Sequence, residues 1–456
     1  MSLYDALMIG VSGLNASSRA MSVFSSNIAN VNTVGYKTSQ SEFETMLGSA
    51  NGGAQGLATG VMASSQANIA QQGADFATSS PTDLAINGQG FFCVNTAADA
   101  SGQALFTRAG SFTPDANGDL KNSAGLYLMG YPVSSGPSTT NSQLTTISTN
   151  GLGGKGEATT KMSLQANLDA SAASVTESGG YQPGDMEDSS TTGVTPQFQT
   201  TINVYDSQGG TQPLQVSYVK TAANTWQYEV SYEGDPNNLQ TPGSGGNPNN
   251  VKNPTDANPI ASGQITFGSD GQLQDVVPTG GPDNNSGTFS LTIPWSSTSG
   301  LQPQTIAFNM GTAGTTDGTS QFASTSVLDS SNTDGAAFGS VTGLTVNPDG
   351  TVDANYSNGL TQAVFKVPLA TFANPDGLSL VAGNAYAQSG ASGTPVINPA
   401  DTAGSGTIQS FALEGSTVDL ATEFTNMITT QQAYSASARV VSTASQMLDE
   451  LMQIQH

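Results

Sequence analysis

A helical pattern at the start of the chain ends in the stretch SNIANVNTVGYK, residues Ser26 to Lys37. Asparagine side chains can hydrogen-bond to backbone groups at a helix end, and Gly35 can adopt backbone angles that other residues avoid. This stretch therefore predicts that an N-terminal helix stops here and that the chain continues in a different kind of structure.

Before this stretch, apolar residues recur at alternating spacings of four and three. The series runs through Leu3, Leu7, Gly10, Leu14, Ser17, Met21, Phe24, Ile28 and Val31. Such heptad spacing places the apolar side chains on one seam of a helix.

The last part of the chain repeats this pattern. Its seam runs through Leu420, Phe424, Met427, Gln431, Tyr434, Ala438, Val441, Ser445, Leu448 and Met452. Ser416 or Thr417 is expected to cap this helix, and Asp419 favours its positive N-terminal end. Either helix alone would fit an ordinary amphipathic helix on a globular core. Because matching seams flank a β-rich middle, we expect the two ends to pair as a coiled coil and to take part in self-assembly.

The middle of the chain shows short alternating stretches separated by turn residues. Those at 198–204, 214–218 and 226–232 predict a three-stranded meander. Asn87-Gly88, between two apolar runs, predicts a hairpin, and Asn117-Gly118 predicts a second turn. Residues 234–262 are rich in Asn, Pro and Gly, which predicts a long surface loop or a subdomain junction.

The charge balance excludes several classes of partner. The chain carries 34 acidic and 10 basic residues, a formal net charge of -24. Few cations are available to neutralise phosphates, so we expect no nucleic-acid partner and no binding to an anionic membrane surface. The chain has no run of about 18 apolar residues, so we expect no membrane insertion. The N-terminus lacks the basic region and cleavage site of a signal peptide, so export without a cleaved signal is expected.

Patterns for catalysis or metal binding are weak. A Ser-His-acid or Cys-His site would need His456, the single histidine, to fold back into it. Cys93 stands in an apolar run and is expected to be a small buried residue. The GxGxxG match at 151–156, the acids at 115–119 and the Glu187-Asp188 pair all fit loops better than sites. We expect no enzyme activity, no metal and no cofactor.

The stretch from Ser26 to Lys37 closely resembles the N-terminal signature of the bacterial flagellar rod and hook protein family, an Asn-rich helix end followed by Thr-x-Gly-aromatic-Lys. The signature residues are Asn27, Asn30, Asn32, Thr33, Gly35, Tyr36 and Lys37. Segments at 83–92, 106–112, 118–120, 125–131 and 413–434 resemble the same family. Rod members of this type are usually shorter, and three further places resemble hook members: 204–209 with Trp226, 349–359, and 41–70 as a connecting segment.

The resemblance implies a multidomain, mainly β protein whose α-helical terminal segments pair as a coiled coil. The implied division is terminal helices at 1–33 and 412–456, a connecting segment at 34–75 and 399–411, a β-rich inner domain at 76–145 and 320–398, and a β-rich outer domain at 146–319, with or without a subdomain at about 233–319.

The function implied by the resemblance is that of a structural subunit of the flagellar hook, an extracellular, flexible helical tube that transmits torque from rod to filament. The implied partners are other copies of the chain, the flagellar rod, hook-cap and hook-filament junction proteins, and the flagellar type III export apparatus. Two alternatives stay open, a distal rod subunit and an acidic extracellular adhesin. The residues expected to make the assembly contacts are Leu7, Leu14, Met21, Phe24, Ile28, Leu420, Phe424, Met427, Tyr434, Val441 and Leu448.

Overall fold

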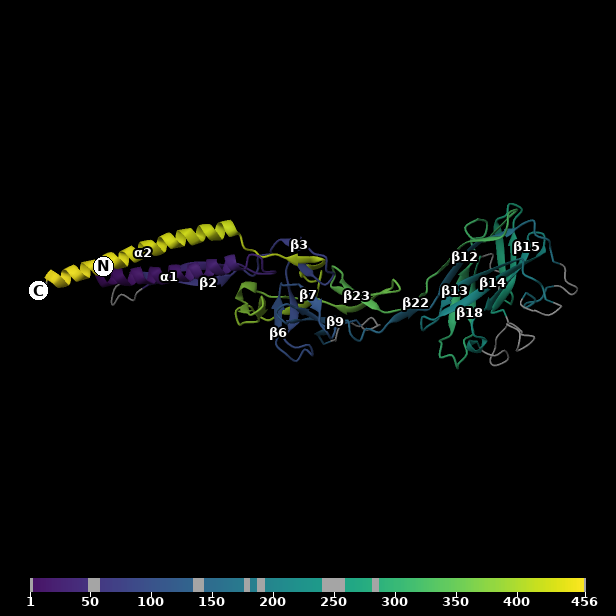
Figure 1. Cartoon of the computed structure of the whole chain (residues 1–456), viewed down its shortest axis with the longest axis horizontal. Helices are drawn as coiled ribbons and strands as arrows, with labels where there is room; N and C mark the ends of the chain where they lie inside the picture. Colours follow the sequence, from purple (N-terminus) through teal and green to yellow (C-terminus); the bar gives the residue numbers. More distant parts are fainter. Residues whose placement is uncertain are drawn as a thin grey trace. The chain divides into compact units, whose positions relative to one another are not determined.

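The computed structural model describes residues 3–47, 58–133, 143–175, 181–186, 193–239, 259–280 and 287–454. Within them the chain is mainly β, with helix α1 at Leu3–Ala29 and helix α2 at Leu420–Ile454 (Figure 1). Two compact units form. The first contains Met1–Leu152, Thr342–Asn355 and Thr361–His456, and the second contains Gly153–Val341 and Tyr356–Leu360.

Helix α1 ends at Ala29 because asparagine side chains take over its last hydrogen bonds. The Asn30 side-chain amide donates to the Ser26 carbonyl at 2.8 Å, and the Thr33 hydroxyl donates to the Asn30 Oδ1 atom at 3.1 Å. Residues 30–35 form turns. The predicted helix end is therefore present at the signature stretch.

Helix α2 begins later than the sequence suggested, and its cap is a different residue. The Asp419 carboxylate accepts the backbone N–H of Ala421 at 3.0 Å and the Thr422 hydroxyl at 3.0 Å, as an N-cap does. The prediction of Ser416 or Thr417 as the cap was wrong. Thr417 instead uses its hydroxyl to accept the backbone N–H of Thr38 at 2.9 Å.

The first unit combines the helices, a two-stranded hairpin and a 13-stranded sheet. In chain order its strands are β1 Ser39–Leu47, β2 Ala58–Ala67, β3 Asp75–Ala77, β4 Leu84–Asn87, β5 Phe91–Asn95, β6 Ala104–Thr107, β7 Phe112–Pro114, β8 Leu120–Asn122, β9 Tyr127–Pro132, β10 Thr145–Thr146, β23 Val341–Val346, β24 Thr351–Tyr356, β25 Thr361–Lys366, β26 Pro368–Thr371, β27 Ser379–Val381, β28 Ala385–Ala387, β29 Val396–Pro399, β30 Thr407–Ser410 and β31 Ala412–Glu414, with a 3-10 turn at Pro375–Gly377.

One of the two predicted turns in this unit is confirmed and the other is wrong. Strands β7 and β8 pair across the Asn117-Gly118 turn. Strand β4, however, pairs with β30, which lies in the 399–411 part of the expected connecting segment, while β5 pairs with β6. A Cβ atom on Gly88 would lie 3.1 Å from the Gly406 Cα atom, so the distant segment packs directly on the expected turn. A local turn signal contains no information about a partner so far away in the sequence.

The second unit has a large hydrophobic core built from residues of two five-stranded sheets, and a smaller cluster of Met186, Val194 and Val219. Strands β13, β14 and β15 form the predicted meander, and β16 and β17 continue it. The core includes Trp226 and Phe308, so the described part of 233–319 shares one core with the rest of the unit. In chain order the strands of the second unit are β11 Lys155–Glu157, β12 Lys161–Asp169, β13 Phe198–Tyr205, β14 Thr211–Ala222, β15 Thr225–Tyr232, β16 Ala261–Phe267, β17 Leu273–Pro278, β18 Thr288–Ile293, β19 Gln304–Asn309, β20 Ser320–Phe322, β21 Val327–Thr333 and β22 Ala336–Gly339, with a 3-10 turn at Pro236–Asn238.

The second part of the inner domain, expected at 320–398, begins later than the sequence suggested. Strands β20 and β21 pair with β12, and β22 pairs with β11, so 320–341 belong to the second unit. The chain re-enters the first unit at Thr342.

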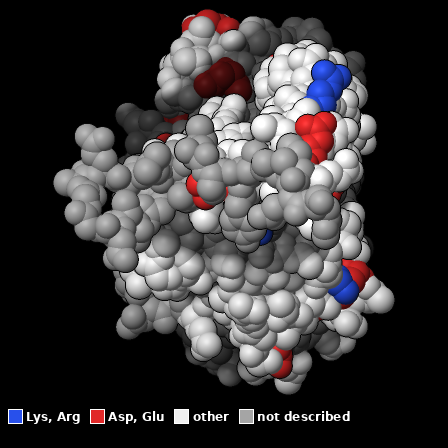
Figure 2. All heavy atoms as spheres, turned by 90° about the vertical axis from the view of Figure 1, so that its left-hand side faces the viewer, with Lys and Arg blue, Asp and Glu red and all other residues white. Residues whose placement is uncertain are grey.

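Charged side chains are sparse on the surface. Only 10% of residues are charged, and Figure 2 shows few acidic and basic side chains among mostly uncharged ones on the face it draws. Yet Lys37, Arg108 and Lys220, three of the 10 basic residues, are buried. Because burying a cation is costly unless it is paired, each has a partner: Lys37 and Arg108 pair with Glu414, and Lys220 donates to the Ala170 carbonyl.

Candidate assembly site

The signature residue Asn27 connects three segments near the end of α1. Its side chain is completely buried. The amide group donates to the Glu423 carboxylate of α2 at 3.0 Å and to the Ser39 carbonyl at 2.8 Å. Its carbonyl oxygen accepts the Tyr36 hydroxyl and the Ser39 N–H, both at 3.1 Å. With these four bonds Asn27 holds α1, α2 and the start of β1 together.

Gly35 is a position at which no other residue fits. Its φ angle is +66°, in the left-handed region, and a Cβ atom would lie 2.7 Å from the Ala109 backbone nitrogen. Its own N–H donates to the Glu414 carbonyl at 2.8 Å. The close approach brings the signature stretch against the residues that surround Arg108.

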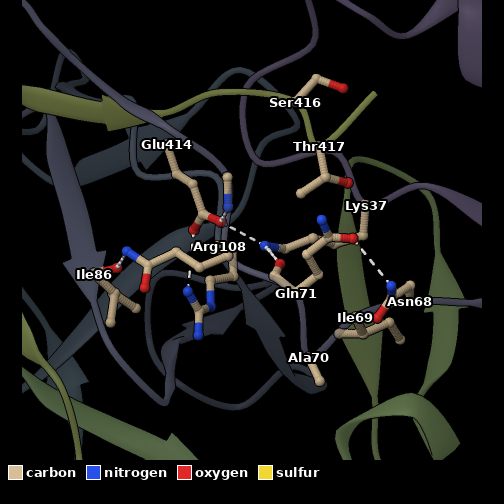
Figure 3. Close-up of polar contacts among 12 residues, drawn as sticks. Lys37, Asn68, Ile69, Ala70, Gln71, Ile86, Arg108, Glu414, Ser416 and Thr417 are labelled. Carbon is tan, nitrogen blue, oxygen red and sulfur yellow. Dashed lines mark hydrogen bonds and ion pairs between the residues drawn. The ribbon is translucent and has the colours of Figure 1, made fainter. Parts of the chain in front are cut away.

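A buried ionic cluster lies next to Gly35. Figure 3 shows its side chains. Lys37 forms an ion pair with one oxygen of the Glu414 carboxylate and also donates to the Gln71 carbonyl. Arg108 binds the other Glu414 oxygen at 3.2 Å and donates to the Gly88 carbonyl at 2.8 Å. One carboxylate on β31 thus binds two cations from separate segments.

The electrostatics of this cluster follow from its burial. Burial lowers the pKa of the Lys37 ammonium, and the Glu414 carboxylate opposes that shift. Asp75 lies opposite Glu414 in the β3–β31 pair. Burial raises the pKa of Asp75, and the negative charge of Glu414 raises it further. The two cations compensate the charge on Glu414, which would otherwise be expensive to bury.

Helices α1 and α2 lie side by side, and small residues on α1 allow the close approach (Figure 1). A Cβ atom on Gly10 would lie 2.7 Å from the Val441 Cγ2 atom, and one on Gly13 would lie 2.9 Å from the Ser437 Oγ atom. Farther along α1, Ala20 is 0% exposed. Small side chains let two helix backbones come near one another, so this stripe positions α2.

The β1–β2 hairpin packs on α1 through β2. The Val61 N–H donates to the Ser12 Oγ atom at 3.2 Å. A Cβ atom on Gly60 would lie 2.5 Å from that same oxygen. Residues 42–46 of β1 are all exposed. The connecting segment expected at 34–75 therefore contains a hairpin held by α1 along one strand.

The residues predicted for assembly fall into two groups. On α1 all of them are buried or half-buried: Leu7, Leu14, Met21, Phe24 and Ile28. On α2, Met427, Val441 and Leu448 are half-buried, whereas Leu420, Phe424 and Tyr434 are exposed. The α2 seam therefore faces α1 only in part.

The family signature residues also differ in how far they are buried. Asn27, Gly35 and Lys37 are buried, Asn30, Thr33 and Tyr36 are half-buried, and Asn32 is exposed. Sequence reasoning missed the central role of Glu414 and Arg108, although both stand in family-like segments. The sequence offered one indication of this role. The chain has only 10 basic residues, so a charged residue in apolar surroundings indicates a partner of opposite charge.

The described residues of this site pack against one another and pair their charges. Among the described residues, no group of three or more His, Cys, Asp or Glu side chains could hold a metal ion. Burial raises the pKa of the Cys93 thiol to about 12. The 151–156 stretch leads into β11, and Asp115 accepts backbone N–H groups of its own turn. His456 and the Glu187-Asp188 pair lie outside the described residues. In the described part of the chain, neither helix is long and apolar enough to cross a membrane.

Four protein-family models match the chain. Residues 7–37 match the flagella basal body rod protein and 85–179 match the flagellar hook protein FlgE/F/G D1 domain. Residues 167–336 match the flagellar basal body protein FlaE D2 domain, and 409–454 match the flagellar basal body rod FlgEFG protein C-terminal model.

Several curated proteins are similar over their whole length. The flagellar hook protein FlgE of Rhizobium meliloti is 34% identical and that of Caulobacter vibrioides is 31% identical, each with 100% of both chains covered. The FlgE of Escherichia coli is 31% identical, with 97% of this chain and 98% of that protein covered. Among solved structures, the Helicobacter pylori flagellar hook protein FlgE2 aligns with a TM-score of 0.41 at 13% identity, covering 73% of this chain and 99% of the other.

Proposed function

This chain belongs to the flagellar hook protein family, and on that premise we propose that it is the structural subunit of a bacterial flagellar hook. The observation that carries the proposal is similarity to hook proteins over 100% of both chains. The family is a structural one and not a family of enzymes. The subunits would self-assemble into a flexible helical tube that transmits torque from rod to filament.

The terminal helices are proposed to form the inner core of that tube as coiled-coil partners. The contacts of Gly10 with Val441 and of Asn27 with Glu423 support this arrangement within one chain. The exposed residues of the α2 seam, Phe424 among them, support further contacts between chains. Contacts that join different surfaces of successive copies generate an open helical polymer when the rotation between copies does not close a ring.

The β-rich units are proposed to form the outer layers, with the inner domain in the first unit and the outer domain in the second. Their surface is rich in uncharged polar residues, which exchange hydrogen bonds with water at little cost. Outer contacts of this kind can slide when the tube bends.

The remaining partners follow from membership of the family. They are the flagellar rod, the hook-cap and hook-filament junction proteins, and the type III export apparatus. Export by that route, without a cleaved signal, would place the protein outside the cell in the hook.

The test is deletion of the gene in its own host, followed by electron microscopy of isolated basal bodies and complementation with the full chain. A hook subunit predicts complete rods without hooks, restored by complementation. Basal bodies that lack the distal rod would identify a rod subunit instead. Intact hooks in the deletion strain, with loss of glycan adhesion, would support the adhesin alternative.

A further inference from the structure

Helix α1 is covered from two directions in the first unit. Helix α2 contacts it at Gly10 and Asn27, and the hairpin contacts it at Ser12. As a result Ala16 and Ala20 are 2% and 0% exposed. Helix α1 is therefore covered on two sides, while Met8, Asn15 and Arg19 on its outer side stay exposed, and α2 and the hairpin each have an exposed side as well.

Helix α2 has an apolar stripe that α1 does not cover. Leu420, Phe424 and Ile428 are 40%, 50% and 54% exposed. Their spacing of four residues puts them on one face of the helix, and we call these three residues the α2 stripe. Arg439 follows Ile428 by about three helical turns, so it lies on the same face. It is exposed as well.

The hairpin has a patch of complementary character. Glu42, Glu44 and Met46 alternate along β1 and so share one face. Met62 lies opposite Glu44 in the β1–β2 pair and joins that face. Met46 and Met62 are 47% and 45% exposed, and both glutamates are exposed. These four residues form the hairpin patch.

We propose that the hairpin patch of one chain docks on the α2 stripe of a second copy of the same chain. The inference rests on the proposed function, because it names the contact through which hook subunits would join. Methionine packs adaptably on aromatic side chains such as Phe424, which suits a contact that shifts as a tube bends. Arg439 supplies the positive charge that Glu42 and Glu44 lack within the described part of their own chain.

The geometry makes this contact heterologous. The two surfaces differ in composition and belong to elements that contact α1 separately. Each copy therefore offers one donor surface and one acceptor surface, so copies can add head to tail, and the result is an open helical polymer where the rotation between copies does not close a ring. A contact between two hairpin patches is disfavoured, since it would bring four glutamates together without a cation.

Disulfide trapping in assembled tubes tests the contact directly. Two full-length variants with one added cysteine each, Phe424→Cys and Met62→Cys, are mixed, polymerised and oxidised. The native Cys93 stays out of the reaction because it is buried and its thiol pKa is raised to about 12. We expect a cross-linked dimer in the mixture and none from either variant alone. Met447→Cys, at 53% exposure on another side of α2, is the matched control and should give no dimer with Met62→Cys.

Charge reversal gives a second measurement. Arg439→Glu should raise the critical concentration for polymerisation on the order of tenfold, because it adds a third acid to the contact. The Glu42→Arg/Glu44→Arg variant should do the same, and combining all three changes should restore the value of the unmodified chain. Arg19→Glu changes the exposed arginine of α1 and should leave polymerisation unaltered.

Three outcomes would overturn the inference. Dimers from Phe424→Cys alone would show that α2 faces another α2. Tubes that form without any cross-link in the mixture would show that the two surfaces do not meet, while the hook function would stand. Failure of the unmodified chain to make hooks in its host would remove the proposed function and this contact together.

Discussion

The Lys37 ammonium and the Glu414 carboxylate form an ion pair whose side chains are 1% and 0% exposed. The pair joins the N-terminal signature to β31, which leads into α2. Breaking a buried pair leaves one charge without compensation, and that is more damaging than the pair is stabilising.

Replacing Lys37 with Met should therefore destabilise the first unit by about 3 kcal/mol. Hydrogen exchange of peptides covering 30–37 and 412–419 would measure the loss. Lys366→Met is the matched control, because Lys366 and Asp349 form a partly exposed pair at 3.5 Å. That change should cost less than about 1 kcal/mol. Equal effects of the two substitutions would contradict the structural role of the buried cluster.

Gly35→Ala should destabilise the same unit through backbone strain and a clash. The left-handed φ of Gly35 costs an alanine about 1–2 kcal/mol, and contact with the Ala109 nitrogen adds to this. Gly404→Ala isolates the first effect, since Gly404 has a φ of +83° and no atom within 4 Å of its Cβ position. Hydrogen exchange should show the larger loss at Gly35, and an equal loss at both sites would rule out the clash.

Gly10→Val should weaken assembly by forcing α2 away from α1. A Cβ atom at this position would lie 2.7 Å from Val441, and overpacking of this kind costs about 1–3 kcal/mol. We expect a higher critical concentration for polymerisation, measured by light scattering. Asn15→Val places the same side chain on the exposed face of α1 and should have little effect. Normal polymerisation of Gly10→Val would show that the helices need not pack closely.

Phe424→Ser should separate folding from assembly. Its side chain is 50% exposed, so unfolding of the monomer should change by less than about 0.5 kcal/mol. Polymerisation should nevertheless decline, because the α2 stripe loses its largest side chain. Leu380→Ser, at 62% exposure on β27, serves as the control for loss of an exposed apolar residue. The assembly role of Phe424 is refuted if both variants polymerise like the unmodified chain.

Glu229→Gln should change the pH dependence of the second unit. Glu229 is 0% exposed, and its carboxylate accepts the Tyr181 hydroxyl and the Gly184 N–H. Burial raises the pKa of this carboxyl above its usual 4.5, and the hydrogen bonds from Tyr181 and Gly184 partly oppose the shift. The folded state therefore binds the proton more tightly than the unfolded state does.

The sign of the effect follows from this difference. The free energy of unfolding should fall as the pH rises from about 4.5 through the folded pKa, and then level off. Glu229→Gln removes the titrating group and should abolish that decline. Denaturant unfolding followed by tryptophan fluorescence reports on the second unit alone, because Trp226 and Trp295 are the two tryptophans of the chain and both lie in its core. An unchanged decline in the variant would assign it to another group.

Local patterns predicted much of the fold. Heptad spacing predicted both helices, and alternation predicted the meander at β13, β14 and β15. These features depend on neighbouring residues, whose periodicity is visible along the chain. The hairpin expected at Asn87-Gly88 was wrong for the opposite reason, since β4 pairs with β30 from the far end of the sequence.

The candidate site was predictable only in outline. The signature residues and most of the helix seams could be identified, but the α2 seam divides into residues that face α1 and exposed residues such as Phe424. The side of α2 that packs on α1 depends on the small residues Gly10 and Gly13 and on the Asn27–Glu423 bond. Those contacts join opposite ends of the chain and have no counterpart in local spacing.

The sequence by itself determined where the helices stand, where α1 stops at the Asn-rich signature, and that this chain resembles flagellar axial proteins. Only the tertiary structure decided that Glu414 pairs with both Lys37 and Arg108, and which apolar residues stay exposed. The physical reason is that helix ends and strand alternation arise from residues close in sequence. A buried charge cluster instead requires three distant segments to meet where water is excluded.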